Sequence, residues 1–589
     1  MMNRKQVENG NLNAKILSSG SCISLARDLL LLVSALFFFL STAAISFPWM
    51  IPFEIAVALV MIWLLKKECK KERKMSAWLR VWLGLMDLTS VFYLSGFFPS
   101  LYPSVIEKEA SIWEKYVPWF SSWPISPFTL FICFASIPFV HWAMGWILYW
   151  AEPEIKAFFG RFSKTEAVCS ILLFVILTSG LTLVSRKCSV WIAPLNPEIS
   201  VEDLPWNPEE VQKNTILGSD CLSFTSFRYS CYLNIFRHPF YSIALFPFLP
   251  FFLILTGILW LCGFGVWFYS AALAMAWLQI GWWVLGAVFL RRLVEKVTDA
   301  FFSYTIWAFY AFSFPAIFTF VPERLTLTLF TLLAFVYFRQ MSARADKSRL
   351  SAFDFALASA AVGTKLTSAL IPVFSIWQNK KSVPGFLKET VRFSLMELVL
   401  AFFLAPSTFD LSYGISECFK WTSIPGTEKD LRSSGPNSHQ GAQFLHFLAG
   451  NLFPPDVYSD AYGLHQVASK SIKPFFLWLG GLIGIMSFLG FWPFRKSGFI
   501  QVAFVWFLTS ILLLGILGFG ARFNEMILYV SYFSWAILPL SVLPLYKLTG
   551  NHPKLASVTV LLLAIVSFGL NVSIFVSVAQ HGMGHFIIP

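Results

Sequence analysis

Charged residues are scarce in this chain of 589 residues. They make up 13% of it, about half of the roughly 25% that soluble domains carry, and the mean hydropathy is +0.66. This excludes an ordinary soluble domain. Long apolar stretches such as 29–47, 125–150 and 475–492 supply the roughly 20 residues that a membrane-spanning helix needs. The chain is therefore predicted to be an all-α, polytopic integral membrane protein.

Cysteine motifs and repeats are also lacking. The nine cysteines have no CxxC spacing, so a metal or redox centre is not expected. No internal repeat is visible, and Asn-x-Ser/Thr sequons are few, which favours a bacterial inner membrane. The net charge of +12 is concentrated in short basic loops. That distribution is the positive-inside pattern of membrane proteins, and no nucleic-acid partner is expected.

The basic loops predict how the chain is threaded. Clusters at 66–74 and 156–164 mark cytoplasmic ends, so a span at 167–184 delivers the polar loop 187–240 to the outer face. About 16 membrane segments follow from this pattern. Further cytoplasmic ends are marked by Arg291-Arg292, 339–349, 380–388, 495–496 and 547–554.

Three later stretches need separate interpretation. Residues 241–290 resemble two spans, although an outer start and a cytoplasmic Arg291-Arg292 require an odd number. Either a third short or re-entrant helix lies there, or the arginine pair is an exception. Residues 350–380 are predicted to form a helical hairpin with Lys365 at its outer tip and Asp354 at the cytoplasmic interface. Residues 406–470 are predicted to be a second outer loop.

These assignments divide the chain into five parts. A cytoplasmic N-terminus and an additional four-helix membrane module precede a membrane core, and an outer loop and C-terminal helices follow it. Asp87 lies inside an apolar stretch of the additional module, so we expect it to face a partner or a cavity. The boundaries are 1–23, 24–164, 165–405, 406–470 and 471–589.

Polar residues that are costly near lipid collect on the predicted outer face. A carboxylate there can accept a proton from an acceptor hydroxyl as a general base. Arg and Lys at the membrane surface can hold a phosphate whose lipid tail stays in the bilayer, and they stabilise it as a leaving group. The candidate residues are Asp220, Arg228, Arg237, His238, Glu323, Lys365 and Arg522.

The order of these motifs resembles the GT-C superfamily of membrane glycosyltransferases. The matching features are an acid in a large outer loop (Asp220), His238-Pro239 before the next helix, Pro322-Glu323 in a later turn, and a small-residue helix that breaks at Thr364-Lys365. The resemblance covers about residues 165–390. It implies a polyprenyl-phosphate-linked sugar as donor and a glycan or glycolipid as acceptor.

The resemblance also implies roles for the residues. Asp220 would be the catalytic base, and Glu323 would assist it or hold a divalent cation. The resemblance leaves the need for that cation undecided. Arg228, Arg237, His238, Lys365 and Arg522 would bind substrate. GT-C enzymes usually reach the acidic loop after one helix, whereas five precede it here, so loop 99–125 with Glu107 and Glu109 is an alternative. The main rival function is a transporter or flippase of an amphiphilic anionic lipid or glycolipid. A non-catalytic assembly protein is the third interpretation.

Overall fold

The chain divides into two compact units, Met1–Pro153 and Glu154–Pro589. Most of the predicted module 24–164 lies outside the residues that the structure describes, so its four helices stay a prediction. The structure is a computed structural model that describes residues 75–87, 127–187, 246–263, 267–320, 324–341, 350–380, 382–404, 440–455, 457–460, 463–466, 472–518, 526–550 and 552–577.

The described residues are α-helical apart from one antiparallel hairpin, β1 (Val457–Asp460) and β2 (Gly463–Gln466). Six of their helical segments are long and apolar enough to cross a membrane. The bent pair α11 (Ala300–Phe312) and η5 (Phe314–Phe320) is a seventh if it forms one span. The prediction of an all-α, multi-pass membrane protein is thus confirmed. The six segments are Lys164–Leu181, Leu273–Glu295, Pro474–Phe494, Gly498–Ile516, Met526–Leu548 and Pro553–Val572.

In the first unit, a half-buried acid has a partner, as the sequence predicted. Asp87 lies in the described helical segment 77–87, and its Oδ2 lies 2.5 Å from Nδ1 of His141. His141 belongs to α5 (Pro127–Gly160), and a second link joins the same segments, because Glu152 accepts a hydrogen bond from the Ser76 amide at 3.1 Å. Paired polar groups of this kind satisfy each other inside an apolar helix pair.

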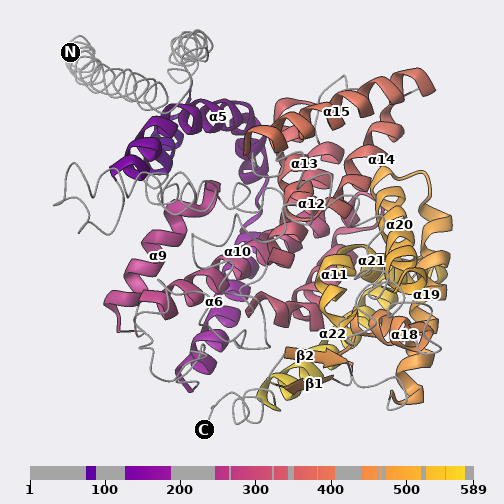
Figure 1. Cartoon of the computed structure of the whole chain (residues 1–589). Helices are drawn as coiled ribbons and strands as arrows, with labels where there is room; N and C mark the ends of the chain where they lie inside the picture. Colours follow the sequence, from indigo (N-terminus) through magenta and orange to yellow (C-terminus); the bar gives the residue numbers. More distant parts are fainter. Residues whose placement is uncertain are drawn as a thin grey trace, which may run out of the picture. The chain divides into compact units, whose positions relative to one another are not determined.

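The second unit is built around two buried helices. α10 (Trp267–Glu295) packs against α6 (Lys164–Lys187), α11 and α12 (Arg324–Met341). α21 (Val530–Leu548) is buried along most of its length between α19 (Pro474–Phe494) and α20 (Gly498–Ser510), the group drawn in orange and yellow in Figure 1. α22 (Pro553–Ser577) covers α11.

Among the described residues of the stretch 241–290, one helix is long enough to cross a membrane. Its described residues form a 3₁₀ turn η4 (Phe246–Phe248), the short helix α9 (Leu249–Leu261) and the long α10. α9 has 13 residues, about 20 Å at 1.5 Å per residue, which is too short for a hydrocarbon core of about 30 Å. It ends at Gly263, whose φ of +77° favours glycine. One crossing by α10 satisfies the odd number that the charge pattern requires.

The predicted break at Lys365 is present. α13 (Ala352–Thr364) ends there, and a 3₁₀ turn η6 (Leu366–Ala369) leads into α14 (Leu370–Asn379). The two arms do not pair with each other as a simple hairpin would. α13 packs against α12, whereas α14 packs against α20 and α15 (Val383–Leu404).

The predicted outer loop 406–470 contains a packed helix. α18 (Gln440–Gly450) lies against α19, where a Cβ on Gly480 would stand only 1.9 Å from the backbone oxygen of Leu445. On the other side of α19, Gly490 meets the Leu540 carbonyl of α21 equally closely. The polar residues around α18 predicted a loop, but small residues on α19 allow this close helix packing. α20 continues as a π-helical turn η9 (Ile511–Ile516), and η10 (Met526–Tyr529) precedes α21.

A single methyl group on α19 is expected to reveal this close packing. Gly480→Ala would push α18 and α19 apart and destabilise the protein by about 1–3 kcal/mol, as overpacking does. Gly481→Ala is the matched control, because nothing lies within 4 Å of a Cβ at that neighbouring position. Thermal unfolding of the two variants in detergent compares them directly, and equal melting temperatures would contradict the packing.

Candidate functional site

Lys365 sits where α13 stops. Its backbone is extended, with φ −156° and ψ 115°, and its amide donates to the Ala361 carbonyl at 3.1 Å. The half-buried side chain directs its ammonium group over two tyrosine rings, 4.2 Å from the ring centre of Tyr529 and 5.0 Å from that of Tyr532. The negative faces of aromatic rings attract a cation. The two rings therefore attract the ammonium group of Lys365 and set its direction.

Two hydroxyl residues of η6 hold Tyr532 in turn. The phenol oxygen of Tyr532 lies 2.6 Å from Ser368 Oγ and 3.1 Å from Thr367 Oγ1. The backbone carbonyl of Tyr532 accepts a hydrogen bond from the Trp506 indole at 3.1 Å. We call Lys365, Thr367, Ser368, Tyr529 and Tyr532 the lysine cluster. It joins the break after α13 to the start of α21, so the ammonium group is carried by rigid, buried structure.

Several segments predicted to be outer ends meet around this cluster. η10, which carries Tyr529, follows the predicted outer turn at Arg522 in the sequence, and it contacts both α18 and β2. The start of α18 is tied to the end of α20 and η9, because the Gln440 side chain donates to the Gly515 carbonyl at 2.8 Å. The described parts of loop 406–470 therefore lie at the same end of the helices as Lys365.

The segments predicted to be cytoplasmic meet at the opposite end. Lys296 donates to the Gln340 carbonyl at 2.7 Å, Arg339 pairs with Asp354 at 3.2 Å, and Gln378 donates to the Gly498 carbonyl at 3.0 Å. These contacts join the ends of α10, α12 and α14 to the starts of α13 and α20. Asp354 lies eleven residues before Lys365, about 17 Å along α13. The ends that carry the predicted cytoplasmic clusters thus lie together, and the side of the membrane that they face stays a prediction.

Buried ion pairs dominate that second end. Arg291 and Arg292, which the charge pattern assigned to a cytoplasmic end, are 6% and 4% exposed. Both bind Glu166, the third residue of α6, at 2.9 Å and 2.7 Å. Asp354, expected at the interface, is also buried and forms a capping box with Ser351. Burial is tolerated because each charge is paired and hydrogen-bonded.

Lys365 is the one predicted site residue within the described part of the chain. Asp220, Arg228, Arg237, His238, Glu323 and Arg522 lie outside it, as do the alternatives Glu107 and Glu109. Their convergence on Lys365 stays a prediction. Among the described residues, no three His, Cys, Asp or Glu side chains gather as a metal site would require. A divalent cation bound between Asp220 and Glu323 therefore stays a prediction.

The partners of Lys365 were not predicted. Tyr529 and Tyr532 stand three residues apart directly after the Arg522 turn, and this spacing places two side chains on one face of a helix. Thr367 and Ser368 follow the lysine itself. A search for aromatic residues beside each predicted outer turn would have found both tyrosines.

Comparison with known proteins gives no match: no protein-family model, no curated protein and no solved structure resembles this chain.

Proposed function

We propose that the chain is a membrane glycosyltransferase with a GT-C-like helical bundle, placed in a bacterial inner membrane. It moves a sugar from a polyprenyl-phosphate donor to a glycan or glycolipid acceptor on the outer face. The observation that supports this most directly is the lysine cluster, in which the ammonium group of Lys365 lies over two tyrosine rings at a helix break. That break lies at the end of the bundle where the predicted outer loops meet.

The proposed chemistry is a single displacement at the anomeric carbon. Asp220 takes the proton of the acceptor hydroxyl, whose oxygen attacks from the face opposite the phosphate, so the configuration inverts. The bond between the anomeric carbon and the phosphate oxygen breaks, and the polyprenyl phosphate leaves with the electron pair. Fixed cations stabilise the charge that develops on it. Lys365, Arg228, Arg237, His238 and Arg522 supply those contacts, and Glu323 assists Asp220 or holds a divalent cation.

The rival function, transport of an amphiphilic anion, predicts paired charges near the middle of the membrane. Among the described residues, the buried pairs of Glu166 with Arg291 and Arg292, and of Arg339 with Asp354, lie within the first or last turns of their helices. One carboxyl group lies further inside, since Glu397 of α15 accepts a hydrogen bond from Ser359 at 2.6 Å. These ion pairs of the second unit favour the enzyme, because they join helix ends and do not line a path between them.

Loss of the Lys365 charge is expected to slow donor cleavage. Lys365→Met keeps the length of the side chain but removes the cation, and loss of one group that stabilises a leaving anion costs about 100-fold in kcat. The assay incubates the purified protein in detergent with labelled polyprenyl-phosphate sugars and an acceptor extract, and it scores release of the polyprenyl phosphate.

The matched control is Lys388→Met, which removes the same charge from an exposed position on α15. It should cleave the donor at the wild-type rate. Equal rates of donor cleavage by the wild type, Lys365→Met and Lys388→Met would show that Lys365 is not part of the site. If the wild-type protein cleaves no donor but carries a labelled amphiphilic anion across reconstituted vesicles, transport replaces the proposed function.

A further inference from the structure

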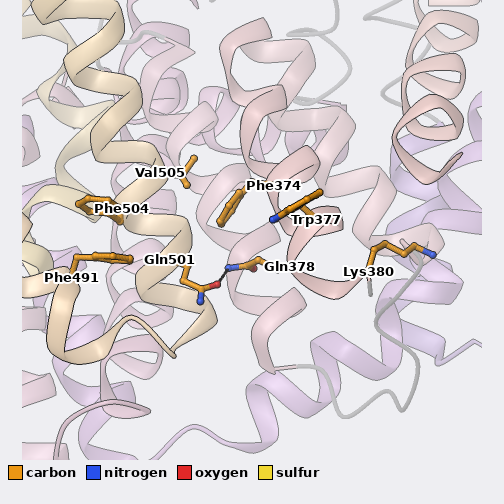
Figure 2. Close-up of a pocket in the computed structure, with 8 residues that line it drawn as sticks. All are labelled: Phe374, Trp377, Gln378, Lys380, Phe491, Gln501, Phe504 and Val505. Atoms are coloured by element: carbon orange, nitrogen blue, oxygen red, sulfur yellow. Dashed lines mark hydrogen bonds between the residues drawn. The ribbon is translucent and has the colours of Figure 1, made fainter. Parts of the chain in front are cut away.

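A groove lies at the end of the second unit opposite the lysine cluster. It is bounded by the last turns of α14, the end of α19 and the start of α20, and it encloses about 500 Å³. This volume falls within the range of small-molecule sites. Figure 2 shows the side chains that line it, which are Phe374, Trp377, Gln378, Lys380, Phe491, Gln501, Phe504 and Val505.

Aromatic rings form two walls of the groove. Phe491 and Phe504 stack with their centres 4.0 Å apart and their planes 16° from parallel. Phe374 and Trp377 stand on α14 across from them (Figure 2), and half of the Trp377 side chain is exposed. These rings give the groove two apolar walls, against which a hydrocarbon chain can bury its surface.

Two glutamines lie between the walls in a fixed orientation. The amide nitrogen of Gln501 donates to the Arg495 carbonyl at 2.7 Å, so its oxygen is the acceptor for Gln378 Nε2 at 2.8 Å. Gln378 Nε2 also donates to the Gly498 carbonyl at 3.0 Å. Gln378 Oε1 is then buried with no donor among the described residues. The glutamine pair therefore joins the end of α14 to the start of α20 between the two walls.

The charge at this end is positive. Lys380 is the charged residue among the eight that line the groove, and it lies on the far side of Trp377 from Phe491 and Phe504 (Figure 2). The connection between α19 and α20 adds exposed Arg495 and Lys496. An anion is therefore favoured at the rim, while the walls accept an apolar chain.

We propose that this groove binds one anionic phospholipid of the predicted cytoplasmic leaflet, of the phosphatidylglycerol type. Lys380 contacts the phosphate, and one acyl chain lies along Phe491, Phe504 and Trp377. The bound lipid would join the end of α14 to the α19–α20 connection. This site does not depend on the glycosyltransferase activity, because it lies at the other end of α14 from Lys365.

Native mass spectrometry of the full-length protein in a neutral detergent tests the site. Phosphatidylglycerol is expected to bind about ten-fold more tightly than phosphatidylcholine of the same acyl chains, because the choline ammonium group cancels the phosphate charge that the basic rim of the groove attracts. Lys380→Gln should lower that preference several-fold. Lys554→Gln, which removes an exposed charge from α22, should keep it.

A second variant keeps the test decisive if the charge change disturbs folding. Val505→Trp fills the groove and is expected to lower the occupancy of both lipids, while the protein still elutes as a single monodisperse species. Equal binding of the two lipids by the wild-type protein, or equal losses in Lys380→Gln and Lys554→Gln, would overturn the proposal. Displacement of phosphatidylglycerol by a polyprenyl phosphate at equal concentration would show that the assigned occupant is wrong.

Discussion

Replacing Asp220 by asparagine is expected to abolish sugar transfer while leaving the amount of protein in the membrane unchanged. Asparagine has the same shape as aspartate but cannot accept the proton of the attacking hydroxyl. General-base catalysis contributes about 10²–10⁴-fold, so transfer should fall by about three orders of magnitude. The measurement is the initial rate of labelled sugar transfer at saturating donor, normalised to the amount of purified protein.

The decisive control lies in the earlier loop. Glu107→Gln and Glu109→Gln make the same chemical change in loop 99–125, the alternative position for the catalytic acid. Both should transfer sugar at the wild-type rate if Asp220 is the base. The opposite pattern, with an active Asp220→Asn and an inactive glutamine variant, would assign the catalytic loop to residues 99–125.

The pattern of charges predicted more of this structure than any motif did. The basic clusters at 339–349, 380–388 and 495–496 marked helix ends that the contacts of Gln340, Gln378 and Gly498 bring together. The break at Lys365 was also predictable, because a run of small residues that ends in Thr-Lys is a weak helix end. Both features depend on local composition, which the sequence displays directly.

Partners distant in the chain could not be predicted in this way. Arg291 and Arg292 beside an apolar run are typical of a cytoplasmic loop. Their buried partner Glu166 lies 125 residues before Arg291 and 126 residues before Arg292. Likewise, the polar composition around residue 440 predicted a loop where α18 lies, because the packing of α18 depends on Gly480 in another helix. Burial of these residues is a property of the tertiary fold, which a single sequence does not reveal.

Glu166→Gln is expected to destabilise the second unit strongly. The Glu166 carboxylate is 2% exposed and accepts hydrogen bonds from both guanidinium groups, at 2.7 and 2.9 Å from Arg292 and at 2.9 and 3.0 Å from Arg291. Glutamine leaves two buried cations facing a neutral amide whose nitrogen is itself a donor. Removing one partner of a buried ion pair costs about 3–5 kcal/mol. Equilibrium unfolding in mixed micelles of a mild detergent and dodecyl sulfate measures the loss.

Glu295→Gln separates this effect from a general loss of negative charge. Glu295 also binds Arg291, at 3.1 Å, but its side chain is 40% exposed and the pair is one turn apart on α10. Such a pair contributes about 0.3–0.5 kcal/mol. Arg292 keeps its other contacts, to the Phe158 carbonyl and the Tyr337 hydroxyl, and these cannot neutralise its charge. A Glu166→Gln protein as stable as Glu295→Gln would mean that water or lipid phosphate reaches the two arginines, and that α6 and α10 do not exclude solvent where they meet.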